Sequence, residues 1–294
     1  MKNKRAMAKI GIAGTFLFAV AIAVILICSN QQVIAGETGD HNVTLEIGNT
    51  APAVVYVAQY DPTGSIDPTS GTTTSVTIEV HVQDVNGIGD IDLVWSDYWY
   101  AAGGETNRSD TNCTYVEDLG SNIANYTCTA DIYFYDIAGS WGMIVYANDT
   151  SSEEASNLTE TFTYNSLQDI SISVSTIQFG AITMGGSDEK ADNDPQAITN
   201  EGNADIATVN VTGYNVKHLT EADNIPATDF KVGAADDCAG VSMNNAESLE
   251  ITGVTIVRGS SSTDDMYYCI PTVPTGLANG NYAATSNWVV TSIV

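Results

Sequence analysis

The chain has 294 residues, which is long enough for two domains that each bury a core. It carries nine Lys and Arg against 36 Asp and Glu, and four of the nine basic residues precede the first apolar run: Lys2, Lys4, Arg5 and Lys9. A surface this acidic repels nucleic acid and anionic lipid, and it attracts cations. We therefore expect no nucleic-acid partner.

An apolar run at residues 10–28 follows those basic residues. With Val33 and Ala35 as small residues before a cut at Gly36, the order is typical of a secretory signal peptide. The run is also long enough to span a bilayer, so an uncleaved N-terminal membrane anchor is the alternative. A third interpretation is a pilin-type leader cut near Gly11, which would keep the apolar helix as a filament core. All three predict an extracellular or cell-surface location, and the protein contacts the membrane through this segment only if the segment is uncleaved.

The cysteines agree with an oxidising compartment. Beyond Cys28 there are four, and no pair has the short spacing of a zinc site or a redox motif. We predict disulfides between Cys113 and Cys128 and between Cys238 and Cys269. A closed loop of about fifteen residues stabilises a fold by about 3 kcal/mol in the chain-entropy account.

Seven N-x-Ser/Thr sequons predict glycosylation if the source organism modifies exported proteins. They lie at Asn42, Asn107, Asn112, Asn125, Asn148, Asn157 and Asn210. Five of the seven fall between residues 107 and 157, in stretches that we interpret as loops and strand ends. That flank is expected to carry sugar.

Segments of alternating polarity recur along the chain, and turn residues separate them. In residues 76–82, Val76, Ile78, Val80 and Val82 alternate with polar residues, which is the period of a strand with one buried face. Strands are predicted, in chain order, at residues 43–47, 54–60, 76–82, 91–100, 113–116, 125–135, 141–145, 158–164, 170–179, 197–200, 206–211, 214–216, 238–243, 249–257, 266–270 and 282–294. One helical turn is predicted at residues 218–225, with Thr220 as its cap, and a solvated acidic loop at residues 187–195.

Many short strands, turn signals every eight to twelve residues and no long helical period predict an all-β fold. We expect two tandem Ig-like β-sandwich domains behind the N-terminal hydrophobic segment. The boundaries are residues 1–35 for the signal peptide or anchor, 36–165 for the first sandwich and 166–294 for the second.

Turn motifs in both halves resemble those of known surface proteins. The first half resembles Ig-like or cadherin-like repeats of prokaryotic, especially archaeal, surface proteins, through Val80-x-Val82-x-Asp84-x-Asn86-Gly87-Ile88-x-Asp90-Ile91 and Trp141-x-x-x-Val145-x-Ala147-x-Asp149. The second half is similar to sandwich modules with a Phe-Gly strand end, a Gly turn and an Asn-x-Gly-Asn loop, here Phe179-Gly180, Gly185-Gly186 and Asn200-Glu201-Gly202-Asn203. The resemblance implies an architecture and a surface location, and it brings no catalytic residue.

A cluster of oxygen-bearing side chains follows the strand at residues 76–82. Ca²⁺ takes six to eight oxygens, and a glycine turn lets short carboxylates converge with backbone carbonyls. The predicted calcium ligands are Asp84, Asn86, Asp90 and Asp92, joined by Asp149 from a neighbouring strand end. The alternative is a solvated turn in which these side chains only cap the loop backbone.

Aromatic residues and the last strand suggest two further surfaces. Trp95, Trp99 and Tyr100 could stack against a sugar ring, and the alternative places them in the core and at an exposed strand end. The strand at residues 282–294 could pair with the edge of a neighbouring subunit, or it could be an ordinary last strand.

Catalytic motifs do not stand out in this sequence. The three histidines lack the partner pattern of a catalytic triad, and there is no Gly-x-Ser-x-Gly elbow. We therefore expect a non-enzymatic structural protein of the cell surface, an envelope component or filament subunit that assembles through β-strand edges with itself or with other surface proteins. The second interpretation is a calcium-dependent adhesion module that binds a glycan or a protein. The third is an extracellular hydrolase, which would need two carboxylates across a cleft.

Overall fold

The structure is a computed structural model that describes residues 42–293. The predicted signal peptide or anchor lies outside these residues. Within the described range, none of the helices has the length and apolar character needed to cross a bilayer. The chain divides into two units, Met1–Gly48 and a compact unit formed by Asn49–Val294.

The compact unit is all-β, as predicted, and it contains two separate groups of buried apolar side chains. We call these groups, with their strands, the first core (residues 53–164) and the second core (residues 170–293). Every described strand pair lies within one core or the other. The predicted boundary at residues 165–166 lies between the two, and their description as Ig-like domains stays a prediction.

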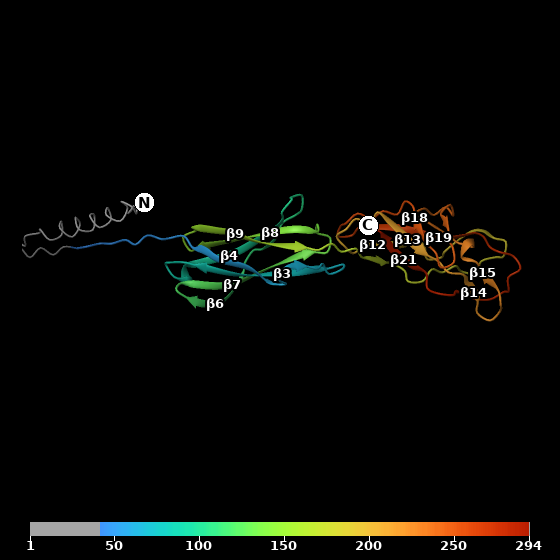
Figure 1. Cartoon of the computed structure of the whole chain (residues 1–294), viewed down its shortest axis with the longest axis horizontal. Helices are drawn as coiled ribbons and strands as arrows, with labels where there is room; N and C mark the ends of the chain where they lie inside the picture. Colours follow the sequence, from blue (N-terminus) through green and yellow to red (C-terminus); the bar gives the residue numbers. More distant parts are fainter. Residues whose placement is uncertain (1–41, 294) are drawn as a thin grey trace, which may run out of the picture. The chain divides into compact units, whose positions relative to one another are not determined.

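The first core has two sheets, with strand orders β1-β3-β7-β6 and β2-β9-β8-β4-β5. Its described strand pairs are antiparallel except for β2 with β9. Figure 1 labels β3, β6 and β7 of the first sheet and β4, β8 and β9 of the second. In β3, Val76, Ile78, Val80 and Val82 are fully buried, because alternate side chains of a strand share one face. The strands are β1 (Ala53–Asp61), β2 (Ser65–Ile66), β3 (Thr73–Gln83), β4 (Ile91–Tyr100), β5 (Arg108–Asp110), β6 (Thr114–Gly120), β7 (Ile123–Tyr133), β8 (Gly139–Asp149) and β9 (Glu154–Tyr164). A short 3-10 helix, η1 (Ile88–Asp90), precedes β4.

The second core is built from shorter strands. Its sheets have the orders β10-β12-β19-β16-β17, with β11 also paired to β19, then β18-β13-β21 and β15-β14-β20. The strands are β10 (Ile170–Ile172), β11 (Ser187–Lys190), β12 (Gln196–Asn200), β13 (Thr208–Thr212), β14 (Val216–His218), β15 (Asn224–Ile225), β16 (Lys231–Gly233), β17 (Val241–Ser242), β18 (Ser248–Ile251), β19 (Thr263–Thr272), β20 (Tyr282–Ala284) and β21 (Val289–Ile293). A second 3-10 helix is η2 (Ala227–Asp229).

Both predicted disulfides are present. Cys113, which directly precedes β6, is bonded to Cys128 of β7, and β6 and β7 pair as the predicted hairpin. Cys238 and Cys269 join a loop to β19 in the second core. Each core therefore carries one covalent link of its own.

The predicted strand at residues 43–47 is wrong. Residues 42–52 form no strand, and the apolar side chains of this segment are 85% (Val43), 83% (Leu45) and 83% (Ile47) exposed. The alternating pattern is present, but no described strand pairs with it. A strand needs a neighbour to satisfy its N–H and C=O groups, and local alternation cannot supply one.

The predicted helical turn at residues 218–225 is also wrong. The segment is a hairpin between β14 and β15, which pair antiparallel. The ring Nδ1 of His218, not Thr220, accepts the turn's backbone N–H groups, from Thr220 at 3.1 Å and Glu221 at 2.8 Å.

Three further segments of the second core differ from expectation. The strand predicted at residues 170–179 stops at Ile172, because Asn193 holds the following residues in a loop through hydrogen bonds with Gln178 N–H and Thr176 C=O. Part of the predicted acidic loop is β11, which pairs with β19. The segment at residues 282–294 forms two strands, β20 and β21, instead of one.

Candidate metal centre

Three carboxylates meet at one end of the first core, which we call its leading end. Asp84 follows β3, Asp90 ends η1, and Asp149 ends β8. One oxygen from each lies within 4.8 Å of the others. Two oxygens bound to the same Ca²⁺ at about 2.4 Å are at most about 4.8 Å apart, so these three side chains can share one ion.

Asp84 is the most constrained member of this cluster. Its side chain is fully buried, and its Oδ1 accepts a hydrogen bond from Asn86 N–H at 2.7 Å. Its Oδ2 is buried without a hydrogen-bond partner among the residues that the structure describes. An unpaired buried carboxylate oxygen is costly, and native proteins rarely leave one unsatisfied. A bound cation is the ligand that would satisfy it.

Asp149 is buried and held ionised by its surroundings. Its Oδ1 accepts N–H groups from Ser151 and Glu153, both at 2.9 Å, and its Oδ2 accepts the Asn49 side-chain amide at 2.6 Å. Burial acts to raise the pKa of Asp149, but these hydrogen bonds outweigh burial and lower that pKa below its usual value. Asp149 therefore contributes a negative charge at neutral pH.

The cluster makes no ion pair with a basic side chain of the described chain. Of the ion pairs found among residues 42–293, none includes Asp84, Asp90 or Asp149. At an effective dielectric constant of about 20, two unit charges about 5 Å apart repel by about 3 kcal/mol. The donors are all oxygen, which suits a hard cation such as Ca²⁺ better than zinc or copper. Residues and electrostatics thus fit a calcium ion, which would draw on Asp84, Asp90 and Asp149.

The other two predicted ligands take different positions. Asn86 supports the site indirectly, because its backbone N–H bonds Asp84 and its Oδ1 accepts Thr50 N–H at 3.0 Å. Asp92 is exposed and is not part of the cluster. The sequence did not point to Asn49 and Thr50, which connect the cluster to the chain segment that precedes β1.

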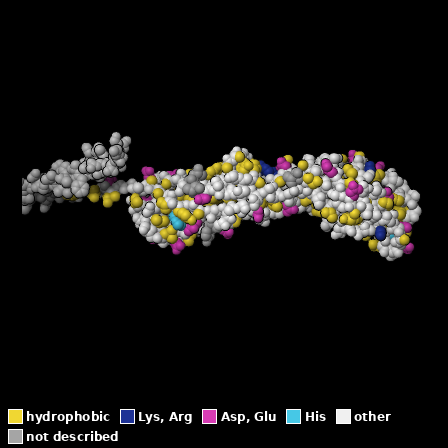
Figure 2. Space-filling model, viewed as in Figure 1, with side chains coloured by type: hydrophobic (Ala, Val, Ile, Leu, Met, Phe, Trp, Pro, Cys, Tyr) yellow, Lys and Arg dark blue, Asp and Glu magenta, His cyan; other side chains and the backbone are white. Residues whose placement is uncertain are grey.

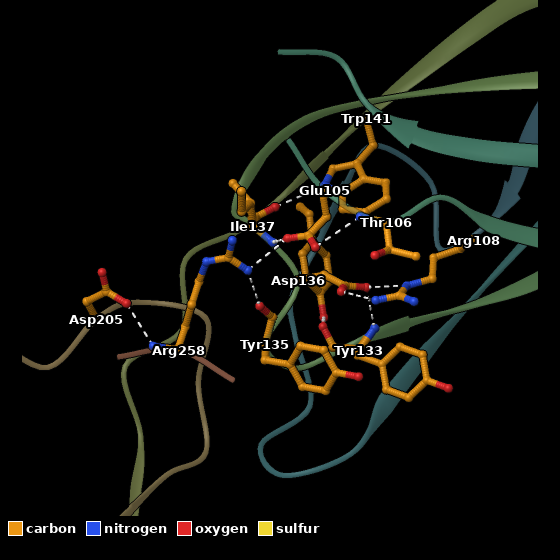
Figure 3. Close-up of polar contacts among 11 residues, drawn as sticks. Glu105, Thr106, Arg108, Tyr133, Tyr135, Asp136, Ile137, Trp141, Asp205 and Arg258 are labelled. Carbon is orange, nitrogen blue, oxygen red and sulfur yellow. Dashed lines mark hydrogen bonds and ion pairs between the residues drawn. The ribbon is translucent and has the colours of Figure 1, made fainter. Parts of the chain in front are cut away.

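The opposite end of the first core, its joint end, carries the contacts with the second core that we call the joint (Figure 3). Arg258 of the second core donates from Nη1 to Glu105 Oε2 and to the Tyr135 carbonyl, both at 2.8 Å. Glu105 Oε2 also accepts Ile137 N–H at 3.1 Å. One arginine therefore ties a loop and a turn of the first core to the second core.

A second arginine neutralises a buried carboxylate near the joint. Arg108 makes a two-point contact with Asp136, whose side chain is fully buried and also accepts Tyr133 N–H at 2.8 Å. The hydrogen bonds to Asp136 raise the pKa of Arg108 above its usual value, against the opposing effect of burial. A bidentate pair of this kind is among the stronger charged contacts in proteins.

The Asn200-Glu201-Gly202-Asn203 loop forms hydrogen bonds with the linker between the cores. Asn203 is buried, accepts Leu167 N–H at 2.7 Å and donates to the Asn165 carbonyl at 2.9 Å. Glycine is required at position 202, because a Cβ there would collide with the Leu167 carbonyl. The motif indicated only a turn in the sequence, and in the structure it connects the second core to the linker. We call the two hydrogen bonds of Asn203 with the linker the Asn203 clasp.

The aromatic residues of β4 divide between two environments. Trp95 stacks on Tyr146 with ring centroids 5.0 Å apart, and Trp99 packs against Gly142; both are half-buried on the outward face of their sheet. Tyr100 packs near Trp141 in the core, with centroids 6.1 Å apart. An outward aromatic pair is compatible with sugar stacking, and Tyr100 does not belong to that surface.

The predicted glycosylation sites differ in exposure. Asn42, Asn107 and Asn112 are exposed. Asn125 is buried in β7 and donates its side-chain amide to Glu79 at 3.2 Å, so a glycan there has no room. The remaining three, Asn148, Asn157 and Asn210, are half-buried.

Similarity to known proteins adds little to this picture. No protein-family model matches the chain, and no curated protein matches it. The chain is similar to a solved structure named BspA_C_mut, with 9% sequence identity, coverage of 84% of this chain and 99% of that chain, and a TM-score of 0.21. A TM-score this low does not establish a shared fold.

Proposed function

We propose that the chain is a non-enzymatic structural protein of the extracellular surface, formed by two Ig-like sandwich modules and working as an envelope component or filament subunit. The observation that carries the proposal is the joint. Arg258, the Asn203 clasp and a short linker connect two disulfide-bonded β cores at several points. A protein that transmits load needs such coupling between its cores, whereas a flexible tether between independent binding modules does not.

Calcium is part of this proposal. The three carboxylates at the leading end would bind Ca²⁺ and fix the turns after β3 and β8 with the chain that enters β1. The ion would then stiffen the first core at the end opposite the joint. Extracellular modules often use weak calcium sites in this way, with dissociation constants of about 10⁻⁴–10⁻³ M.

The acidic surface fits the same setting. In Figure 2, carboxylates are scattered over the visible face and basic side chains are few. Such a surface stays hydrated in high salt and keeps copies apart unless a specific contact joins them. Secretion would also provide the oxidising compartment that both disulfides need.

Electron microscopy of the protein released from its native cell surface tests the proposal. We expect ordered filaments or sheets with calcium present, and weaker or lost order in chelator. Dispersed particles under both conditions would overturn the assembly role.

A second candidate function is calcium-dependent binding of a glycan, and the outward Trp95–Tyr146 stack favours it. Binding of oligosaccharides to the dispersed protein, lost in a Trp95→Ala variant and kept in a Tyr100→Phe variant, would support this alternative. Retention of binding in Trp95→Ala would remove it.

A further inference from the structure

The segment at residues 43–47 has the alternating sequence pattern of a β-strand, but it pairs with none of the described strands. Its apolar side chains Val43, Leu45 and Ile47 alternate with Thr44 and Glu46, and each of the three is at least 83% exposed. Soluble proteins tolerate single exposed apolar residues, but an aligned row of three is typical of an interaction surface. Adding the segment to a sheet edge would bury that row and pair its backbone.

The edges of the described sheets differ in how well they are protected against such pairing. β-bulges, charges and short length all block addition of a strand. β6 has two register shifts and two acidic residues, β1 has two register shifts, β11 has three charged residues, and β18 contains Glu250. The other edges, β2, β5, β10, β15, β17 and β20, have three residues or fewer.

β21 is the unprotected edge among the described strands. It lies at the end of the β18-β13-β21 order, pairs with β13 over five residues without a register shift, and contains no charged residue. Val289 and Ile293 are 44% and 42% exposed on one of its faces. In a chain this acidic, a low-charge contact is the one in which two copies repel each other least.

The segment cannot reach β21 of its own chain. Val43 precedes Asn49 by six residues, so it lies at most about 22 Å from Asn49 even when fully extended. Asn49 is fixed to Asp149 at the leading end, and the eleven residues of β8 span about 33 Å to the joint end. β21 belongs to the second core, which contacts the first core at the joint end.

We infer that residues 43–47 of one copy add as a strand to the β21 edge of a second copy. The inference rests on the proposed function and gives its assembly a specific contact. Five residues face five residues, and Val43, Leu45 and Ile47 would extend the apolar row of Val289 and Ile293. The base of the donated segment is held at the leading end by hydrogen bonds from Asn49 to Asp149 and from Thr50 to Asn86.

Cross-linking between two preparations of the full chain tests the contact directly. One preparation carries Leu45→Cys and the other Thr291→Cys, both in a Cys28→Ser background, and they are mixed with a short thiol-reactive cross-linker. We expect a cross-linked dimer that requires both preparations. The matched control replaces Thr291→Cys by Tyr115→Cys on the edge strand β6, where we expect none. Equal cross-linking to β6, or none to β21, would overturn the inference.

A pair of charge substitutions tests the apolar row. Leu45→Asp puts a charge on the row, whereas Thr44→Asp puts the same charge on the opposite face of the segment. Because residues 42–50 are exposed, neither change should alter the thermal unfolding of the cores. We expect the association constant, measured by sedimentation, to fall at least tenfold in Leu45→Asp and much less in Thr44→Asp.

The outcomes separate this inference from the proposed function. If the unmodified chain does not associate at all, the assembly function fails and the strand contact with it. If the chain associates and Leu45→Asp associates as well as Thr44→Asp does, the strand contact is overturned and the assembly function stands.

Discussion

The two ends of the first core bury carboxylates in opposite ways. At the joint end, the buried Asp136 is matched by Arg108, and Glu105 is matched by Arg258. At the leading end, three carboxylates converge without an ion pair to any described basic side chain. The chain has five basic residues after Ala35, and its only two arginines there are both committed to the joint end. We therefore propose that a cation from solution balances the leading end.

The largest expected effect comes from breaking the ion pair between Arg108 and Asp136 at the joint end. Arg108→Ala leaves Asp136 buried and unpaired, so we expect the free energy of unfolding to fall by about 3–5 kcal/mol. Denaturant unfolding measures this change. Lys217→Ala removes an exposed lysine and is the matched control, with a change within about 0.5 kcal/mol. A loss below about 1 kcal/mol in Arg108→Ala would contradict the assigned pairing.

At the leading end, we expect the stability of the fold to depend on calcium instead. With Ca²⁺ at about 100 times its dissociation constant, the unmodified chain should gain about 2.7 kcal/mol of unfolding free energy. Asp84→Asn should lose this gain, and in chelator it should be at least as stable as the unmodified chain because one repulsive charge is gone. Thermal unfolding with and without calcium measures both effects.

Asp92→Asn is the control for that experiment. Asp92 carries the same charge two residues after Asp90, at the start of β4, but it lies outside the cluster. It should keep the full calcium gain. A calcium gain that survives in Asp84→Asn, or that disappears equally in Asp92→Asn, would argue against the centre.

Asp194 in the second core shows a third environment for a carboxylate, in which burial makes the side chain easier to protonate. Burial raises the pKa of Asp194 to about 6, with help from nearby Asp236 and against a hydrogen bond from Tyr268 N–H and the charge of Lys190. Its Oδ1 has no hydrogen-bond partner among residues 42–293. The folded chain therefore binds this proton more tightly than the unfolded chain, where the pKa is about 3.9.

The raised pKa of Asp194 makes the folded chain more stable at low pH than at neutral pH. Stabilisation from the proton is complete below about pH 4 and is lost as pH rises through about 6. The loss is up to about 3 kcal/mol before solvent screening reduces it, so we expect about 1–2 kcal/mol. Asp194→Asn should flatten this part of the stability profile between pH 4 and 7. An unchanged profile in that variant would assign the dependence to other groups.

The local sequence pattern predicted the features that depend on residues close together in the chain. The alternation of Val76 to Val82 predicted β3, and cysteine spacing predicted both disulfides. The short glycine turn placed Asp84 and Asp90 together, and Asp149 joined them because β8 ends beside that turn. Asp92 was included because it is close in sequence, yet the chain has already turned into β4 at that point.

Contacts between distant segments were not predicted. The roles of Glu105, Asp136 and Arg258 depend on residues up to 153 positions apart, and sequence alone does not place them together. A signal was available, since the two arginines in so acidic a sequence after Ala35 are expected to pair with buried carboxylates. The pattern at residues 43–47 is strand-like, but pattern alone does not say which strand is its partner.

The smallest expected effect concerns Arg258, which spans the joint. Its pair with Glu105 is partly exposed, so a double-mutant cycle with Arg258→Ala and Glu105→Gln should give a coupling energy of about 1 kcal/mol. Arg258 also donates to the Tyr135 carbonyl, so Arg258→Ala should cost more than Glu105→Gln.

Calorimetry adds a second measure of the same contact. With the joint intact we expect the two cores to unfold together, and in Arg258→Ala we expect the transition to broaden or split, because the cores lose a contact that couples them. A single transition of unchanged width, with zero coupling energy, would mean that the Asn203 clasp alone joins the cores. The stability of the joint end would then come from the pair of Arg108 and Asp136, which lies within the first core.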